Sequence, residues 1–214
     1  MIITYHGHAE FLLETADGRR VLFDPFPSEI GFPMRRVKAD VVCISHHHFD
    51  HNHVDKVDGK PIVIDTEGTH IPLPGIRVRA VKAYHDQEQG KLRGEILCTR
   101  VETDGLSVLH LGDLGEVPGP ELAEQLFMPD ILLIPIGGTY TLDADMAAQT
   151  IKLLQPRVII PMHYKSPQGG IDKITTLAPF VEAMAPLIPS VQPLIRVTRE
   201  DLSCQPHLVE LTVR

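Results

Sequence analysis

The sequence predicts a mixed α/β domain in which helices pack on the outside of a pair of β-sheets. The first half of the chain has short strands separated by turn signals, and the second half contains a strand–helix–strand unit. Hydrophobic residues make up 43% of the 214 residues, which is enough for a full buried core. No linker or low-complexity stretch interrupts the pattern, so residues 1–214 are expected to form one domain.

Short strands are predicted throughout the first half. Ala-Asp-Gly at 16–18 and Thr-Asp-Gly at 103–105 are typical of hairpin turns between them. The run 41–45 is apolar without polar alternation, which is typical of a strand buried on both faces, and 61–64 is similar. The predicted strands of this half are 2–5, 10–14, 20–23, 41–45, 61–64, 76–83, 95–102 and 106–111.

The second half is predicted to alternate strands and helices. Residues 131–135 and 158–161 are expected to be buried parallel strands, joined by a right-handed connection through a helix over 143–154. Asp143 is the expected N-cap, since its carboxylate can accept hydrogen bonds from free amides of the first turn. The remaining predictions are a helix over 171–184, broken at Pro179 by the missing amide donor, and a strand-like tail over 194–213.

Composition narrows the class of protein. A net charge of −8 argues against a surface that coats nucleic acid. The three cysteines, Cys43, Cys98 and Cys204, are far apart and odd in number, which favours a reducing compartment. The N-terminus lacks the pattern of a signal peptide, and no apolar run approaches the roughly 20 residues that span a bilayer. The sequence therefore predicts a cytoplasmic protein without a membrane segment.

Many of the 12 histidines cluster, and the densest run extends from Ser45 to His51 with the sequence SHHHFDH. Residues two apart on extended backbone point to the same side, so His46 and His48 can meet at one metal ion while His47 points away. Asp50 and His51 follow where the chain turns and can reach a second ion. A surface histidine patch or an expression tag is the competing interpretation. This run is internal, follows an apolar strand and contains a carboxylate, which favours a metal site.

One ion needs three or four protein ligands, so other segments must contribute. His85, Asp113 and His163 each come just after the carboxyl end of a predicted strand. Each alone is weak support, because His and Asp are common at strand ends. With the run at 45–51, however, they supply five histidines and two aspartates. This set is sufficient for two metal ions with open positions.

The chain resembles the metallo-β-lactamase superfamily of metal-dependent hydrolases. Its signature H-x-H-x-D-H stands at 46–51, and the later motifs match at His85, Gly112-Asp113 and Pro161-Met162-His163-Tyr164. The segment 134–141, followed by a helix, is similar to a compact prokaryotic branch of zinc-dependent hydrolases related to the ascorbate-6-phosphate lactonases. The resemblance implies a four-layer αβ/βα sandwich with the site at one edge of the paired sheets.

The same resemblance implies how the ligands divide. It places His46, His48 and His85 on a first metal ion, places Asp50, His51 and His163 on a second, and makes Asp113 the bridge. Iron-dependent redox relatives have a glutamate where this chain has His48, so two Zn²⁺ ions are expected, with Mn²⁺ or Fe²⁺ as alternatives. The usual Gly-Gly after the signature is absent, since Asn52-His53 follows instead.

The expected chemistry is hydrolysis by a metal-bridging hydroxide, because two metal ions lower the pKa of a shared water from about 15.7 toward 7. Asp50 and Asp113 are the predicted catalytic carboxylates: Asp50 orients the hydroxide or relays its proton, and Asp113 bridges the metals. Small esters, lactones or thioesters are the expected substrates. Candidate substrate contacts are Thr139 and Tyr140, before a helix N-terminus, and Tyr164 and Lys165, although structural roles explain these residues equally well.

Two other functions remain open from the sequence. A phosphodiesterase or ribonuclease can also use a two-metal site, but the acidic balance and the lack of a long basic segment disfavour nucleic acid as a partner. A metal-binding protein without turnover is the second alternative. The sequence does not distinguish a monomer from a homo-oligomer.

Overall fold

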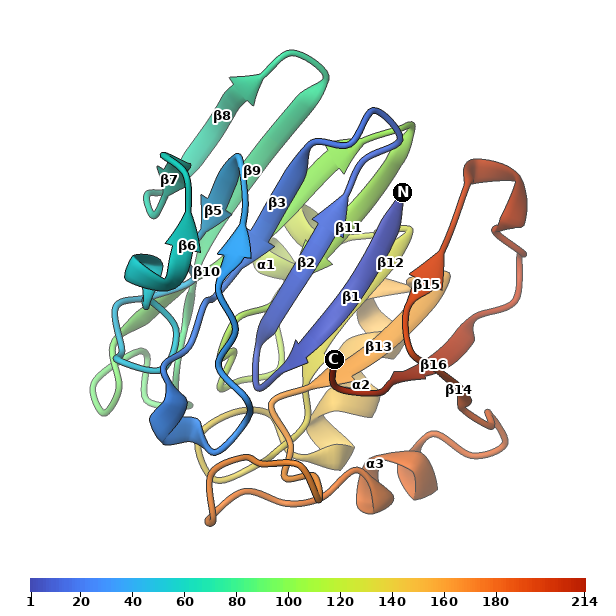
Figure 1. Cartoon of the computed structure of the whole chain (residues 1–214). Coiled ribbons are helices and arrows are strands. Elements are labelled where there is room, and N and C mark those ends of the chain that lie inside the picture. The colour runs from blue at the N-terminus through green and yellow to red at the C-terminus, as the bar shows by residue number, and fades with distance from the viewer.

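Two mixed β-sheets face each other and enclose the main hydrophobic core (Figure 1). The computed structural model describes residues 1–214. One sheet has six strands in the order β15-β1-β2-β3-β5-β7, and the other has eight in the order β14-β16-β13-β12-β11-β10-β9-β8. This architecture confirms the predicted fold class of helices and paired sheets.

The bounds of the elements follow the predicted pattern closely in the first half. The six-stranded sheet contains β1 (Ile2–Gly7), β2 (Glu10–Glu14), β3 (Arg20–Phe23), β5 (Val41–Cys43), β7 (Ile62–Ile64) and β15 (Ile195–Arg196). The eight-stranded sheet contains β8 (Gly68–Leu73), β9 (Ile76–Tyr84), β10 (Glu95–Thr103), β11 (Leu106–His110), β12 (Ile131–Pro135), β13 (Val158–Met162), β14 (Ser190–Gln192) and β16 (His207–Leu211). A separate ribbon pairs β4 (Val37–Lys38) with β6 (Val57–Asp58), and the α-helices are α1 (Pro120–Leu126), α2 (Ala144–Leu154) and α3 (Ala178–Ala183).

The apolar runs without alternation form strands that are covered on both faces. In β12, Ile131 and Leu133 belong to the core between the sheets, whereas Leu132 and Ile134 belong to the core under the helices. The alternation follows from the two-residue period of a strand. Such a strand can exist only in the middle of a layered structure, which is where β12 lies.

The two outer faces of the sandwich are covered differently. All three α-helices pack on the eight-stranded sheet, and α2 contributes Ala147, Ile151 and Leu154 to the core there. The outer face of the six-stranded sheet is covered instead by the β4–β6 ribbon, whose Val37 and Val57 pack on that sheet. The fourth layer of the sandwich therefore consists of this ribbon and contains no α-helix.

The predicted hairpins and the predicted N-cap are present, whereas one predicted helix is much shorter than expected. Both hairpins are present, and Asp143 is the N-cap of α2, where its carboxylate accepts a hydrogen bond from the amide of Met146 at 2.9 Å. The helix predicted over 171–184 was wrong: only Ala178–Ala183 is helical. Pro179 stands in the first turn of that helix, where no amide donor is needed, so it starts the helix instead of breaking it.

The strand at 61–64 exists, but its predicted burial on both faces was also wrong. Ile62 and Val63 are 44% and 42% exposed, because β7 is the edge strand of its sheet. Strand β8 and helix α1 were not predicted. None of the helices combines the length and the apolar character needed to cross a bilayer.

Strand direction determines where the polar loops meet. β3, β5 and β7 run parallel to one another in the first sheet, and β11, β12 and β13 do so in the second. Neighbouring parallel strands have their carboxyl ends at the same edge of a sheet. The loops that follow β3 and β13 lie at the lower edge of the sandwich in Figure 1.

Candidate metal centre

The predicted ligands come together at this edge of the sandwich. His46 follows β5, His85 follows β9, Asp113 follows β11 and His163 follows β13. Six of the seven predicted ligands are buried, with exposures between 0% and 7%, and only His48 is exposed. A group of this many titratable side chains is rarely buried unless its members are paired or bind a metal ion.

The first group consists of His46, His48 and His85. One ring nitrogen from each of these residues lies within 4.8 Å of the others. The Nε2 atom of His46 is 3.0 Å from the Nδ1 atom of His48, which agrees with two side chains that project to the same side of an extended segment. His47, in contrast, is exposed and lies 3.4 Å from the carboxylate of Asp65.

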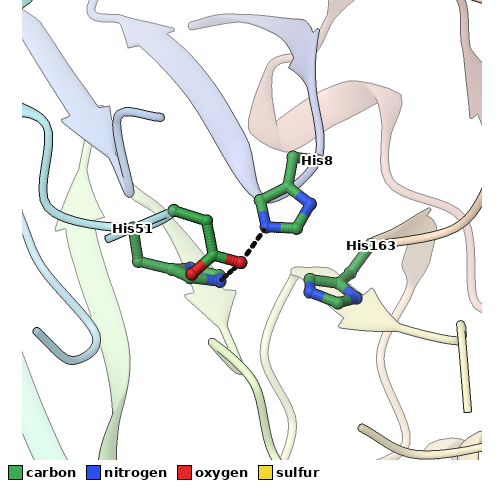
Figure 2. Close-up of side chains that lie close together, drawn as sticks. His8, His51 and His163 are labelled. Carbon is green, nitrogen blue, oxygen red and sulfur yellow. Dashed lines mark hydrogen bonds and ion pairs between the residues drawn. The ribbon is translucent and has the colours of Figure 1, made fainter. Parts of the chain in front are cut away.

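The second group consists of Asp50, His51, His163 and His8, again within 4.8 Å of one another. Figure 2 shows the rings of His8, His51 and His163 around one small space. His8 comes from the tight connection between β1 and β2, and its Nε2 atom is 3.0 Å from the Oδ2 atom of Asp50. The backbone carbonyl of His8 also accepts a hydrogen bond from the amide of His163 at 2.7 Å, so this connection holds two members of the group.

Asp113 lies between the two groups. Its Oδ2 atom is 3.2 Å from Nε2 of His51, 3.3 Å from Nε2 of His163 and 3.4 Å from Nε2 of His85. The preceding Gly112 has a φ of +54°, and a Cβ at this position would be 2.6 Å from the Cβ of Ser45. Only glycine allows the two strand ends to approach so closely.

The donor atoms of this cluster fit a bound cation. Asp113 Oδ1 is buried without a hydrogen-bond partner, and Nε2 of His51 and Nε2 of His163 lie near Asp113 Oδ2 without the geometry of a hydrogen bond. Buried polar atoms of this kind are uncommon in native proteins and indicate an unfilled role such as ion binding. Neutral imidazole nitrogens and a carboxylate are also the ligands that zinc prefers.

The pKa shifts of the histidines in the cluster have opposite directions. Burial lowers the pKa of His46 to about 3, and the neighbouring His51 adds to this effect. Burial also lowers the pKa of His85. The pKa of His51 is raised, since the carboxylates of Asp113 and Asp24 outweigh the opposing effect of burial. The carboxylates thus favour positive charge at the centre, whereas burial favours the neutral form of His46 and His85.

Hydrogen bonds on the far side of three rings, those of His46, His51 and His85, orient their Nε2 atoms toward the centre. Asp24 accepts hydrogen bonds from the amide of Ser45 at 2.7 Å and from its hydroxyl at 2.5 Å, and Nδ1 of His51 is 2.9 Å away. Since the hydroxyl of Ser45 donates to Asp24, its oxygen can accept from Nδ1 of His46 at 2.9 Å. Nδ1 of His85 lies 3.1 Å from the carbonyl of Tyr140. These contacts assign the proton to Nδ1 and leave Nε2 free to bind a metal ion.

A cavity of about 700 Å³ opens over the cluster and includes five of the predicted ligands in its wall. Tyr140 lines this cavity, whereas the hydroxyl of Thr139 donates a hydrogen bond to the backbone carbonyl of Lys173 at 2.8 Å. Tyr164 is buried in the helical core instead of the cavity wall. Lys165 forms an ion pair of 2.6 Å with Asp172 and does not line the cavity.

Sequence reasoning did not identify several residues of this region. Asp24 shared the signal that identified His85 and Asp113, since it directly follows the strand β3, but it was not singled out. Phe49 was seen only as a spacer in the signature, yet it is 63% exposed and lines the cavity. Arg93 and Lys173 also line it and carried no sequence signal, because they lie in irregular segments.

Comparison with known proteins identifies the family. Residues 2–163 match the β-lactamase superfamily domain. A UPF0173 metal-dependent hydrolase from Thermoplasma volcanium is 32% identical over 192 residues, which cover 77% of this chain and 83% of that protein.

Two solved structures of related hydrolases are similar to this chain. A predicted Zn-dependent hydrolase of the metallo-β-lactamase superfamily from Thermotoga maritima has a TM-score of 0.79 and 30% identity, covering 99% of this chain and 98% of its own. A predicted metal-dependent hydrolase from Parabacteroides distasonis has a TM-score of 0.66 and 25% identity, covering 86% of this chain and 88% of its own. The chain therefore belongs to the β-lactamase superfamily, among the UPF0173 metal-dependent hydrolases.

Proposed function

We propose that the chain is a dinuclear zinc hydrolase of small esters, lactones or thioesters. The observation that carries this proposal is the position of Asp113, whose carboxylate contacts histidines of both ligand groups. In this proposal His46, His48 and His85 hold one ion, Asp50, His51 and His163 hold the other, and Asp113 is shared. Mn²⁺ or Fe²⁺ could replace zinc, because metal availability also decides loading.

Bound metal ions would supply Lewis acidity, which lowers the pKa of water and stabilises negative charge on a substrate oxygen. The protein supplies position and protonation state. Asp50 is held by the Nε2 atom of His8 at 3.0 Å, which fixes the direction of its carboxylate. Its pKa is lowered: burial acts to raise it, but the hydrogen bond with His8 and the charge of His51 prevail. Asp50 is therefore a carboxylate at neutral pH and can orient a water molecule by accepting a hydrogen bond from it.

The surroundings of the centre support a small substrate. A cavity of about 700 Å³ is within the range of ligand pockets, which is about 300–1,000 Å³. The net charge of −8 does not favour a nucleic-acid chain as the substrate. The core shared by the two sheets supports treating residues 1–214 as one hydrolase domain. All three cysteines are free thiols, which supports a cytoplasmic location.

Metal analysis followed by a hydrolysis panel tests the proposal. The purified protein would be assayed for bound zinc, manganese and iron, then offered lactones, thioesters, carboxylic esters and phosphodiesters. We expect two ions per chain and turnover of at least one carbon-centred substrate.

His48→Ala and His47→Ala are the matched pair of variants. They remove adjacent side chains of the same type, but only His48 belongs to a ligand group. We expect loss of turnover in His48→Ala and retention in His47→Ala. Hydrolysis that survives His48→Ala, or activity restricted to phosphodiesters, would contradict the proposal.

A further inference from the structure

The loop between β9 and β10 is organised around one buried carboxylate. Asp86 is 2% exposed, and its two oxygens accept hydrogen bonds from the amides of Glu88, Gly90, Leu92 and Arg93 at 2.8–3.0 Å. Four backbone donors on one carboxylate fix the course of the whole loop. The loop begins directly after His85, so it is anchored at the metal centre.

This fixed loop presents Arg93 to the cavity. The Arg93 guanidinium lies 5.4 Å from the centre of the Tyr140 ring and donates one hydrogen bond to the carbonyl of Thr139 at 3.2 Å. The neighbouring carbonyl, that of Tyr140, contacts Nδ1 of His85. One short segment therefore holds both a metal ligand and this arginine. An arginine has five N–H donors, and most of those on Arg93 have no protein partner.

The charges around the cavity leave this cation uncompensated. Neither Arg93 nor Lys173, the two basic residues of the wall, forms an ion pair with the protein. Of the two acidic residues outside the ligand groups, Asp172 is paired with Lys165, and Glu29 forms no ion pair with Arg93. Phe49 adds an exposed aromatic surface to the same wall. The cavity thus combines the predicted metal ligands, an apolar contact and a guanidinium without an ion-pair partner.

We propose that Arg93 is a specificity residue that binds an anionic group, a carboxylate or a phosphate, at the end of the substrate remote from the cleaved bond. This proposal rests on the proposed function, because it assumes that the reacting group lies at the metal centre. Arginine suits the role because its planar fork binds carboxylate and phosphate with two hydrogen bonds. Asp86 is a positioning residue that holds the loop.

Binding of paired anions to the zinc-loaded protein tests the inference without requiring turnover. Butyrate has one carboxylate, which the metal centre can bind. Succinate, glutarate and adipate have a second carboxylate at increasing distance, and 4-phosphonobutyrate replaces it with a phosphonate. Calorimetric titration would measure the preference for each two-anion ligand over butyrate.

We expect at least one two-anion ligand to bind about ten- to a hundredfold more tightly than butyrate, as charge-assisted hydrogen bonds suggest. Arg93→Gln should reduce this preference to less than about threefold while leaving butyrate affinity and zinc content unchanged. Lys91→Gln is the matched control, since it removes a positive charge from the same loop outside the cavity wall. It should behave as the wild type. The ligand that gains most would show whether carboxylate or phosphate is preferred.

Three results would overturn the inference. The first is a wild-type protein that binds zinc and butyrate but prefers none of the two-anion ligands. The second is an Arg93→Gln variant that keeps the preference, and the third is an equal loss in Lys91→Gln. A wild-type protein that binds neither zinc nor butyrate would instead contradict the proposed function, and this inference with it.

Discussion

The floor and the rim of the cavity are built in opposite ways. The floor comprises the ligand groups, Asp113 and Asp24, and nearly all of its side chains are buried and contact one another. The rim comprises Phe49, Arg93, Tyr140 and Lys173, which are partly or fully exposed and come from irregular segments. A floor of this kind can hold metal ions, and a rim of this kind can change without disturbing the floor.

This difference separates the chemistry of the protein from its choice of substrate. Ligand geometry depends on contacts between strand ends that are distant in sequence, so any single loss should affect the whole floor. Rim residues contact few others, so their loss should change substrate affinity alone. Loops on a rigid scaffold commonly divide function in this way.

The largest effect is expected from removing a ligand outside the signature run. His163→Ala should lower hydrolysis by roughly a hundredfold or more, as His46→Ala should, because the loss of even an outer partner of a metal ligand costs about 10–100-fold. Steady-state kinetics and zinc content would be measured together for both variants. A His163→Ala enzyme with near wild-type turnover would mean that the run at 46–51 is a sufficient metal site by itself.

Acid should destabilise the metal-free floor. Burial lowers the pKa of His8 to about 4 and of His46 to about 3, whereas an unfolded histidine has a pKa of about 6.5. As the pH falls below 6.5, the unfolded chain binds protons first, so stability is lost by up to roughly 2 kcal/mol per histidine at pH 5. His51 acts in the opposite direction, since its raised pKa favours the folded state at low pH.

Burial also lowers the pKa of His85 and His110, so the destabilising histidines outnumber His51. Urea unfolding in the presence of a chelator at pH 7.5 and pH 5 measures the balance. We expect a lower free energy of unfolding at pH 5. Equal or greater stability at pH 5 would show that the floor is not held by neutral histidines.

A smaller effect is expected from a residue that supports the floor without belonging to a ligand group. Asp24→Asn should weaken zinc binding by about 10–100-fold, since an amide replaces the carboxylate that orients His51 and Ser45. Chelator competition would give the affinity, and circular dichroism would show whether the fold persists. Unchanged zinc affinity in a folded variant would exclude an orienting role for Asp24.

The smallest effect is expected at the rim. Phe49→Ala should raise KM by about tenfold or less and leave zinc content unchanged, because it removes an exposed apolar contact worth about 1 kcal/mol. Steady-state kinetics would measure KM, and elemental analysis would measure zinc content. A large fall in kcat or a loss of zinc would show that the rim and the floor are not independent.

The sequence predicted the floor better than the rim for a physical reason. Metal ligands must be His or Asp and must follow strand ends, and both properties can be read from the residues around His85, Asp113 and His163. The contact of Asp113 with both ligand groups depends on tertiary structure, and only the resemblance implied it. Rim contacts depend on the path of loops, so Arg93 was not identified and Tyr164 lies in the core instead.

The same distinction holds for the fold. Short strands that stand out from their flanking residues, such as β2, β3 and β12, have the bounds that were predicted. The segment 171–177 was predicted as part of a helix, but its backbone instead contacts another loop: the amide of Thr175 donates a hydrogen bond to the carbonyl of Gly137. Local pattern cannot reveal a tertiary contact of this kind.

The metal content of Asp113→Ala tests the shared centre most directly. Elemental analysis of purified wild type, Asp113→Ala and His47→Ala, each loaded with zinc and then desalted, gives ions per chain. We expect two ions in the wild type and in His47→Ala, and fewer than one in Asp113→Ala, because Asp113 contacts both ligand groups. Two ions retained by Asp113→Ala would contradict a centre built around this carboxylate.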